Sequence, residues 1–454
     1  MKTDAILTAQ PIPQLVRNIA IPASVGFFFN TMYNVVDTYF GGLISTQALA
    51  ALSLSFPIFF IIISVGSGLS TGATALMANS AGAGDSAQVR LFAVQGVTYG
   101  LILALFVTLL GIYTSPFLFS ILGASGSYLT LCLQYMNTIF AGSFLFMLLY
   151  MLNAVLNAHG NTKPFRNFLI IGFLLNILLD PWFIYGGFGV PPLGVTGIAL
   201  ATVLIQLLGC IYLTAKVFQT GLISGFTLKE AIPRLQPYKE ISQQGFPASV
   251  NMMTVGLGIF VITYFISKFG KEAVAAYGIA TRIEQIALLP TIGLNIATLT
   301  LVAQNNGAGL YNRIRESLHT ALKYGGILMS VGTLGIFTFA GYLMAIFTDD
   351  SKVISVGTGY LKIAAFLLFA YVILFVHVAA LQGMKKPMFA VWIGMFRQIV
   401  APVVVFYSVT EFLDFGLKGV WWGIFSINWS AAVIAIIYSR RRLNQAACIS
   451  AKVY

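Results

Sequence analysis

Two acidic side chains lie inside long apolar stretches of the sequence. Asp37 follows Asn34 by three residues and Asp180 follows Asn176 by four, so on a helix each acid shares a face with an amide. An ionised group at the centre of a bilayer costs about 3 kcal/mol, and its presence calls for a functional reason. Two carboxyl groups with amide neighbours can exchange protons or hold a small cation. Asp37 and Asp180 are therefore the first candidates for chemistry.

Burial and a neighbouring carboxyl group both favour the neutral form of a carboxyl group, and such a pair titrates as one coupled unit. That is the chemistry a proton-driven carrier requires. Alternatively, each acid lies solvated at the outer membrane interface, with Pro181 marking the helix end beside Asp180. The internal repeat described below favours the first interpretation. The positions that correspond to Asp37 and Asp180 in the second half carry Ile262 and Pro402.

A hinge is predicted in the same stretch as Asp37. Pro22 and Gly26 precede the acid, and proline removes a backbone hydrogen bond and permits a kink. Protonation of Asp37 would then accompany bending of the helix. A static kink required by packing is the alternative, and the sequence leaves both open.

Other polar residues in apolar stretches are weaker candidates. Arg282 and Glu284 are two positions apart, so they do not share a helical face; each pairs with another helix or lines a cleft. In the first half, the further polar candidates are Tyr135, Asn153, Thr202 and Gln206. Taken singly, such residues are more typical of hydrogen bonds between helices than of ligands.

No enzyme motif accompanies these residues. The sequence contains no G-x-x-x-x-G-K-[ST] loop, so ATP is not the expected energy source. Its three histidines have no metal-ligand spacing, and its three cysteines support no disulfide framework. We therefore expect no enzymatic activity, no bound metal and no organic cofactor. The expected coupling ion is a proton, with Na⁺ as the alternative.

The composition shows which elements position the two acids. Of the 454 residues, 58% are hydrophobic and only 8% are charged, against about 25% charged in soluble domains. These values exclude a water-soluble enzyme, a disordered chain and a disulfide scaffold. The apolar runs are too long for a transmembrane barrel, whose strands alternate over about ten residues. The fold class is therefore an all-α polytopic membrane protein.

Twelve apolar stretches are long enough to span a membrane, which takes about 20 residues. They lie near residues 15–40, 48–78, 92–116, 126–156, 165–186, 193–217, 241–267, 273–303, 316–347, 353–383, 388–410 and 417–439. The polar residues 1–14 do not resemble a signal peptide, so the first stretch is expected to remain as a membrane helix.

The distribution of charge predicts the orientation of the chain. With the amino terminus inside, 19 of the 25 Lys and Arg residues fall on the inner side and five on the outer side. Arg282 lies within a span, and Arg397 is counted with the inner cations. Both termini are therefore expected in the cytoplasm of a bacterium, with the chain in the inner membrane. The same bias explains the net charge of +12 without nucleic acid.

The two halves of the chain repeat one another. Ile-Pro-Ala-Ser-Val at 21–25 recurs as Phe-Pro-Ala-Ser-Val at 246–250, and Gly-Ala-Gly at 82–84 recurs at 307–309, both with an offset of 225. Each half has six spans, so the halves enter the membrane in the same direction. The predicted domains are an amino-terminal lobe at 1–217, a cytoplasmic linker at 218–240, a carboxy-terminal lobe at 241–439 and a cytoplasmic tail at 440–454.

The repeat, the twelve spans and the positions of the acids resemble the multidrug and toxic compound extrusion (MATE) family. Tyr-Asn-Val-Val-Asp at 33–37 and Gly-Ile-Ala-Thr-Arg-Ile-Glu at 278–284 are similar to motifs of its DinF-like prokaryotic branch. The resemblance implies two six-helix lobes in a V shape, cation-coupled export of amphipathic and often cationic compounds, and bending of helix 1 near Pro22. The coupling network that it implies comprises Asp37, Asn176, Asp180, Tyr135, Asn153 and Thr202.

The sequence departs from the NorM-like branch, which carries cation-binding acids in helices 7 and 10. Val255 and Tyr371 stand there instead, which favours protons acting through the first lobe. A sodium-coupled drug antiporter using the same site is the main alternative. A flippase for lipid-linked precursors is a further one, and it would favour a more basic cleft. The expected partners are small-molecule drugs and the lipid bilayer, and we expect a monomer.

Overall fold

The computed structural model describes residues 4–223, 225–413 and 415–451, and these are almost entirely helical. Ten of the helices in this part of the chain are long and apolar enough to span a membrane, or twelve if each of two bent pairs is one span. The predicted all-α polytopic fold class is confirmed. The elements are α1 (Asp4–Ala9), α2 (Ile12–Ile44), α3 (Thr46–Gly82), α4 (Ser86–Ile121), α5 (Gly126–Ala141), α6 (Ser143–Ala158), α7 (Lys163–Tyr185), α8 (Val195–Gln219), η1 (Leu228–Ala231), α9 (Leu235–Ser267), α10 (Lys271–Gly307), α11 (Tyr311–Ala345), α12 (Ser351–Ala364), α13 (Leu367–Gly383), α14 (Met388–Met395), η2 (Phe396–Val400), α15 (Ala401–Tyr407), η3 (Ser408–Phe412) and α16 (Gly416–Ala451).

The fourth and tenth predicted spans are bent, by 47° between α5 and α6 and by 49° between α12 and α13. A bend frees backbone carbonyl groups, which need a new donor inside a membrane. Thr108 on α4 donates to the carbonyl of Phe140 at 2.8 Å, and Thr333 on α11 donates to that of Ala365 at 2.7 Å. The two donors, Thr108 and Thr333, are 225 residues apart, and so are the two acceptors, Phe140 and Ala365. The internal repeat therefore extends to the hydrogen bonds that stabilise the bends.

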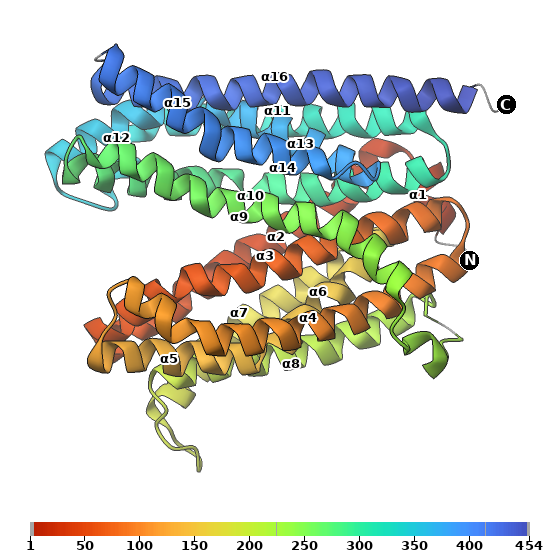
Figure 1. The fold of residues 1–454 in the computed structure, drawn as a ribbon, viewed down its shortest axis with the longest axis horizontal. Coiled ribbons are helices and arrows are strands. Elements are labelled where there is room, and N and C mark those ends of the chain that lie inside the picture. Colours follow the sequence, from red (N-terminus) through yellow and green to blue (C-terminus); the bar gives the residue numbers. More distant parts are fainter. Residues whose placement is uncertain (1–3, 224, 414, 452–454) are drawn as a thin grey trace. The chain divides into compact units, whose positions relative to one another are not determined.

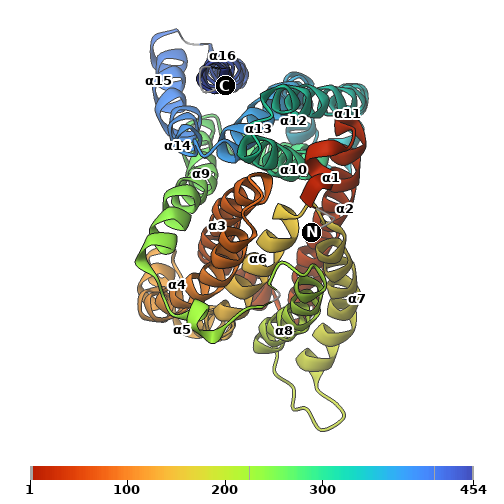
Figure 2. The same ribbon diagram turned by 90° about the vertical axis from the view of Figure 1, so that its right-hand side faces the viewer.

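The chain forms two compact units. The N-terminal unit is Val25–Ser249, and the C-terminal unit combines Met1–Ser24 with Val250–Tyr454. Figures 1 and 2 show α3 to α8 of the N-terminal unit, with α7 and α8 side by side. The units divide inside α2 and inside α9, whereas the predicted boundaries at 217 and 241 are the ends of predicted spans. Helix α16 also continues to Ala451, beyond the predicted end of the last span at 439.

Close helix contacts explain why residues 235–249 belong to the N-terminal unit and residues 12–24 to the C-terminal unit. A Cβ atom added to Gly68 on α3 would clash with Ser249, and one added to Gly293 on α10 would clash with Ser24. The two serines donate to backbone carbonyl groups, Ser249 to Val65 at 3.5 Å and Ser24 to Pro290 at 3.2 Å. Glycine permits this backbone approach between membrane helices.

Valine at Gly68 or at Gly293 should therefore destabilise the protein. Overpacking of this kind costs about 1–3 kcal/mol, and the clash involves backbone atoms that cannot rotate away. Gly278→Val is the matched control, because a Cβ atom at that position of α10 meets no atom within 4 Å. Thermal unfolding of the purified variants in detergent measures the effect. Equal melting temperatures for Gly293→Val and Gly278→Val would contradict this explanation of the fold.

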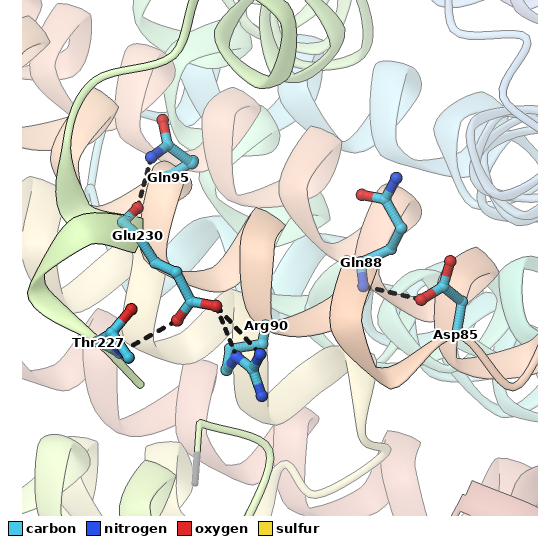
Figure 3. A network of polar contacts seen from close by, with 6 residues as sticks. All are labelled: Asp85, Gln88, Arg90, Gln95, Thr227 and Glu230. Atoms are coloured by element: carbon cyan, nitrogen blue, oxygen red, sulfur yellow. Dashed lines mark hydrogen bonds and ion pairs between the residues drawn. The ribbon is translucent and has the colours of Figure 1, made fainter. Parts of the chain in front are cut away.

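An ion pair and several hydrogen bonds hold the segment between α8 and α9 against α4. Arg90 forms an ion pair with Glu230 at 3.0 Å, and Gln95 donates to the carbonyl group of Glu230 at 2.6 Å (Figure 3). Gln95 also donates to the carbonyl group of Ile232 at 2.8 Å. The Gln95 side-chain oxygen also accepts from the backbone of Arg234 at 2.9 Å. The backbone N–H of Thr227, and then Arg90, hold the pKa of Glu230 below its usual value. The predicted linker is therefore bound to the N-terminal unit along part of its length.

Gln95→Ala should release this segment. The substitution removes three hydrogen bonds, each worth about 1 kcal/mol, so local opening becomes more frequent. Trypsin cleavage after Lys229 or Arg234 should then accelerate at least about tenfold, the effect of losing about 1.4 kcal/mol. Gln88→Ala, at an exposed position of the same helix, should leave the rate unchanged. Equal cleavage rates in both variants would show that Gln95 does not hold the segment.

Candidate coupling site

The structure brings Asp37 and Asp180 together through one amide. The side-chain nitrogen of Asn176 donates to Oδ1 of Asp37 at 2.8 Å and to Oδ1 of Asp180 at 2.9 Å. Asp37 comes from α2, whereas Asn176 and Asp180 lie one turn apart on α7. Asp37 is 9% exposed, and Asn176 and Asp180 are fully buried. The alternative interpretation, two solvated acids at the interface, does not describe this arrangement.

Two acceptor atoms of the site have no hydrogen-bond partner. Oδ2 of Asp180 and Oδ1 of Asn176 are buried and accept no hydrogen bond. The site therefore has unused acceptors for a proton or a small cation.

Hydroxyl groups on α2, α5 and α8 lie near the two acids. Tyr33 on α2 donates to Thr202 on α8 at 3.1 Å. Tyr33 and Tyr135, on α5, both lie within electrostatic range of Asp37 and Asp180. Tyr135 and Thr202 were predicted for this site, and Tyr33 was not. Its position four residues before Asp37, one helical turn away, was the available signal.

Two predicted members lie outside this network. The side chain of Asn34 is exposed and donates to the carbonyl of Asn30 at 2.8 Å. Asn153 on α6 is buried, but its Oδ1 has no hydrogen-bond partner, and no hydrogen bond joins it to the two acids. On α2, the Tyr33 side chain thus bonds to another helix, through Thr202 on α8, whereas the Asn34 side chain bonds within α2.

The predicted hinge residues lie in one continuous helix. Pro22 is buried within α2, two residues before the division between the two compact units. Gly26 lies close to α7, since an added Cβ atom would be 3.1 Å from the Cα atom of Arg166. Gly26 thus has a packing role between α2 and α7 in addition to the predicted hinge role.

Arg282 and Glu284 lie in different surroundings, as their spacing predicted. Arg282 is exposed on α10, whereas Glu284 is 5% exposed. The Glu284 carboxyl group is hydrogen-bonded with Tyr360, and its Oε1 is buried without a partner. The two residues therefore do not form a joint cleft site. Within the described residues, no group of three His, Cys, Asp or Glu side chains is arranged to hold a metal ion.

The structure corrects the placement of Arg397. This residue was counted with the cations of the inner loops, but it is the tenth residue of the 23-residue span Met388–Thr410. Its side chain is only 9% exposed. The predicted span 388–410 already contained this position, so the assignment of Arg397 to the inner side conflicted with the predicted span.

Two repeated helix bundles, with a carboxyl pair in only one of them, can now be compared with known proteins. The MatE family model matches residues 22–182 and again residues 247–411. The two matches begin 225 residues apart, at the predicted repeat offset, and together they cover most of the chain. The chain belongs to the MatE family. The resemblance to MATE transporters is confirmed, and so is their fold for this chain.

Several MATE proteins are similar over nearly their whole length. A probable multidrug resistance protein NorM of Thermotoga maritima is 27% identical, covering 92% of this chain and 90% of that protein. An FAD transporter of Shewanella oneidensis is also 27% identical, with 92% of both covered. A multidrug export protein MepA of Staphylococcus aureus is 25% identical, covering 96% and 95%. A crystal structure of MATE in the bent conformation has a TM-score of 0.92 at 25% identity and 99% coverage of both chains. A crystal structure of MATE in the straight conformation has a TM-score of 0.91, with 98% of this chain and 99% of that chain covered.

Proposed function

We propose that this protein exports amphipathic, often cationic, compounds across a bacterial inner membrane in exchange for protons. The observation that carries the proposal is the single Asn176 amide that links two buried carboxyl groups on α2 and α7. Relatives named as multidrug resistance and export proteins support the substrate class. The excess of Lys and Arg on the inner side, 18 of 25 without Arg397, supports an orientation with both termini in the cytoplasm.

The exchange follows from what a second proton does to these contacts. In this proposal the two carboxyl groups hold one proton between them, and both accept from Asn176. A second proton removes the remaining negative charge, so the charge-assisted bonds from Asn176 become ordinary ones, about half as strong. The link between α2 and α7 then weakens. Pro22 lowers the cost of bending α2, and a bend changes the shape of the N-terminal unit so that the compound leaves.

The solved relatives support a conformational change of this kind. This chain is similar to MATE structures described as bent and as straight, with TM-scores of 0.92 and 0.91. In this proposal, protonation shifts the population between two such states because the contact of Asp37 on α2 with Asn176 on α7 differs between them.

Sodium is the second candidate for the coupling ion. Carboxylate, amide and hydroxyl oxygens suit a hard cation, and Oδ2 of Asp180 and Oδ1 of Asn176 are buried without partners. Proteoliposomes separate the two ions. A proton gradient imposed without sodium should drive accumulation of a fluorescent organic cation, and a sodium gradient at equal pH should not. Transport driven by sodium alone, and unaffected by a protonophore, would overturn the assignment of protons.

A further inference from the structure

Arg397 is a buried cation in the middle of a span, and no acidic residue of the described chain pairs with it. Its guanidinium lies over the rings of Tyr371 and Phe375, at 5.7 and 5.9 Å from their centroids. Nη1 donates to Oδ1 of Asn428 on α16 at 3.0 Å. Asn428 is itself oriented, because its amide nitrogen donates to the carbonyl of Ile424 at 2.8 Å. Two aromatic rings and one fixed amide thus determine the direction of the guanidinium.

Most of the donors of this guanidinium are unused. A guanidinium has five N–H donors, and only one hydrogen bond from Arg397 to the described residues is present. Nε and Nη2 are not among the fully enclosed polar atoms without partners. They therefore keep some access to the space around them. A cation at membrane depth, oriented by its neighbours and left with free donors, calls for an anionic partner from outside the chain.

The backbone at this position is also unusual. Arg397 lies in η2, a π-helical turn between α14 and α15, and such turns occur frequently at functional sites. One turn earlier, Gly394 leaves room for α9: an added Cβ atom would lie 2.5 Å from Oδ1 of Asn251 and 2.8 Å from Oγ1 of Thr254. Neutral polar groups therefore approach the same helix close to the cation.

We infer that Arg397 binds an anionic group, a carboxylate or a phosphate, on an amphipathic substrate. Carboxylate and phosphate fit the planar fork of a guanidinium by two parallel hydrogen bonds, and the apolar rings beside it suit the body of such a compound. The inference rests on the proposed transport function and adds a specificity-determining residue to it: Arg397, in the C-terminal unit, selects compounds that carry an anionic group.

Binding of a matched pair of compounds tests this inference. A fluorescent fluoroquinolone carries a carboxylate and an ammonium group, and its methyl ester keeps only the ammonium group. We expect the full-length protein at pH 7.5 to bind the acid about 10- to 100-fold more tightly than the ester, as charge-assisted hydrogen bonds imply. Arg397→Gln should abolish this preference, and Arg397→Lys should retain a smaller one because an ammonium group lacks the planar fork.

The controls separate a binding role from a structural one. Arg282→Gln removes the exposed arginine of α10 and should leave the preference unchanged. If Arg397→Gln does not fold, Asn428→Ala, which removes the residue that orients the guanidinium, should lower the preference several-fold. Equal binding of acid and ester by the folded wild-type protein would overturn the inference, as would a full preference in folded Arg397→Gln.

A lipid headgroup offers the same phosphate chemistry, and the bilayer composition distinguishes the two sources. The preference for the acid should be equal in nanodiscs of phosphatidylcholine alone and in nanodiscs with added phosphatidylglycerol. A preference that disappears with phosphatidylglycerol would assign Arg397 to an anionic lipid instead of the substrate. Export of a cation without an anionic group should persist in Arg397→Gln, and its loss in a variant that still binds that cation would instead place Arg397 in the transport machinery.

Discussion

Replacement of Asp37 by asparagine should abolish proton-driven export while the protein remains folded. Asparagine has nearly the same shape and can still accept the hydrogen bond from Asn176, so the free energy of unfolding should change by about 1 kcal/mol or less. It cannot bind or release a proton in the working pH range. Efflux of a fluorescent cation from cells or proteoliposomes, normalised to the amount of folded protein, should fall to the level without transporter.

An exposed acid of the same unit provides the control. Asp85 caps α4, where its side chain accepts from the backbone of Gln88 at 2.9 Å, and asparagine caps a helix equally well. Asp85→Asn should therefore keep normal export. Normal drug resistance in cells that carry Asp37→Asn would refute the coupling scheme, whatever the melting temperature of the variant.

Asn176→Ala should have the second largest effect. The substitution removes the one donor that Asp37 and Asp180 share and leaves two buried carboxyl groups with fewer partners. An unsatisfied buried polar group costs about 1–3 kcal/mol, so the melting temperature should fall and the transport rate should drop at least about tenfold. The loss of rate should persist at temperatures where the variant is fully folded, because α2 and α7 are no longer linked through the proton site.

Asn34→Ala is the matched control for this variant. Asn34 was predicted to accompany Asp37, but it is exposed and its amide donates to the backbone. Its replacement should leave the transport rate within about twofold of the wild-type rate, because a substitution at a surface position changes the free energy by only about 0.4 kcal/mol. If Asn34→Ala and Asn176→Ala were equally impaired, the geometry of the site described above would be wrong.

The spans could be predicted from hydropathy because each one is a long apolar run. The positions of the bends could not, because they depend on contacts between helices: Thr108 and Thr333 donate to the freed carbonyl groups from other spans. The division of the compact units inside α2 and α9 could not be predicted for the same reason. It depends on the approach of Ser24 to Gly293 and of Ser249 to Gly68, which hydropathy does not record.

The candidate site was partly predictable, because an acid in an apolar run is conspicuous and helical spacing restricts its neighbours. Spacing of three or four residues does not decide between Tyr33 and Asn34, since both lie within one turn of Asp37, and the positions of α7 and α8 decide it. Arg397 was missed because it was counted with the inner cations, although it lies within the predicted span 388–410. Its aromatic partners come from α13, far from it in the sequence.

Proton release on substrate binding tests the coupling scheme most directly. A fluorescent organic cation is added to the purified wild-type protein in weakly buffered solution, and a pH indicator records any protons that appear. The scheme predicts release in proportion to the cation bound, and none from Asp37→Asn even where that variant still binds the cation. Binding to the wild type without acidification, or equal acidification from Asp37→Asn, would contradict it.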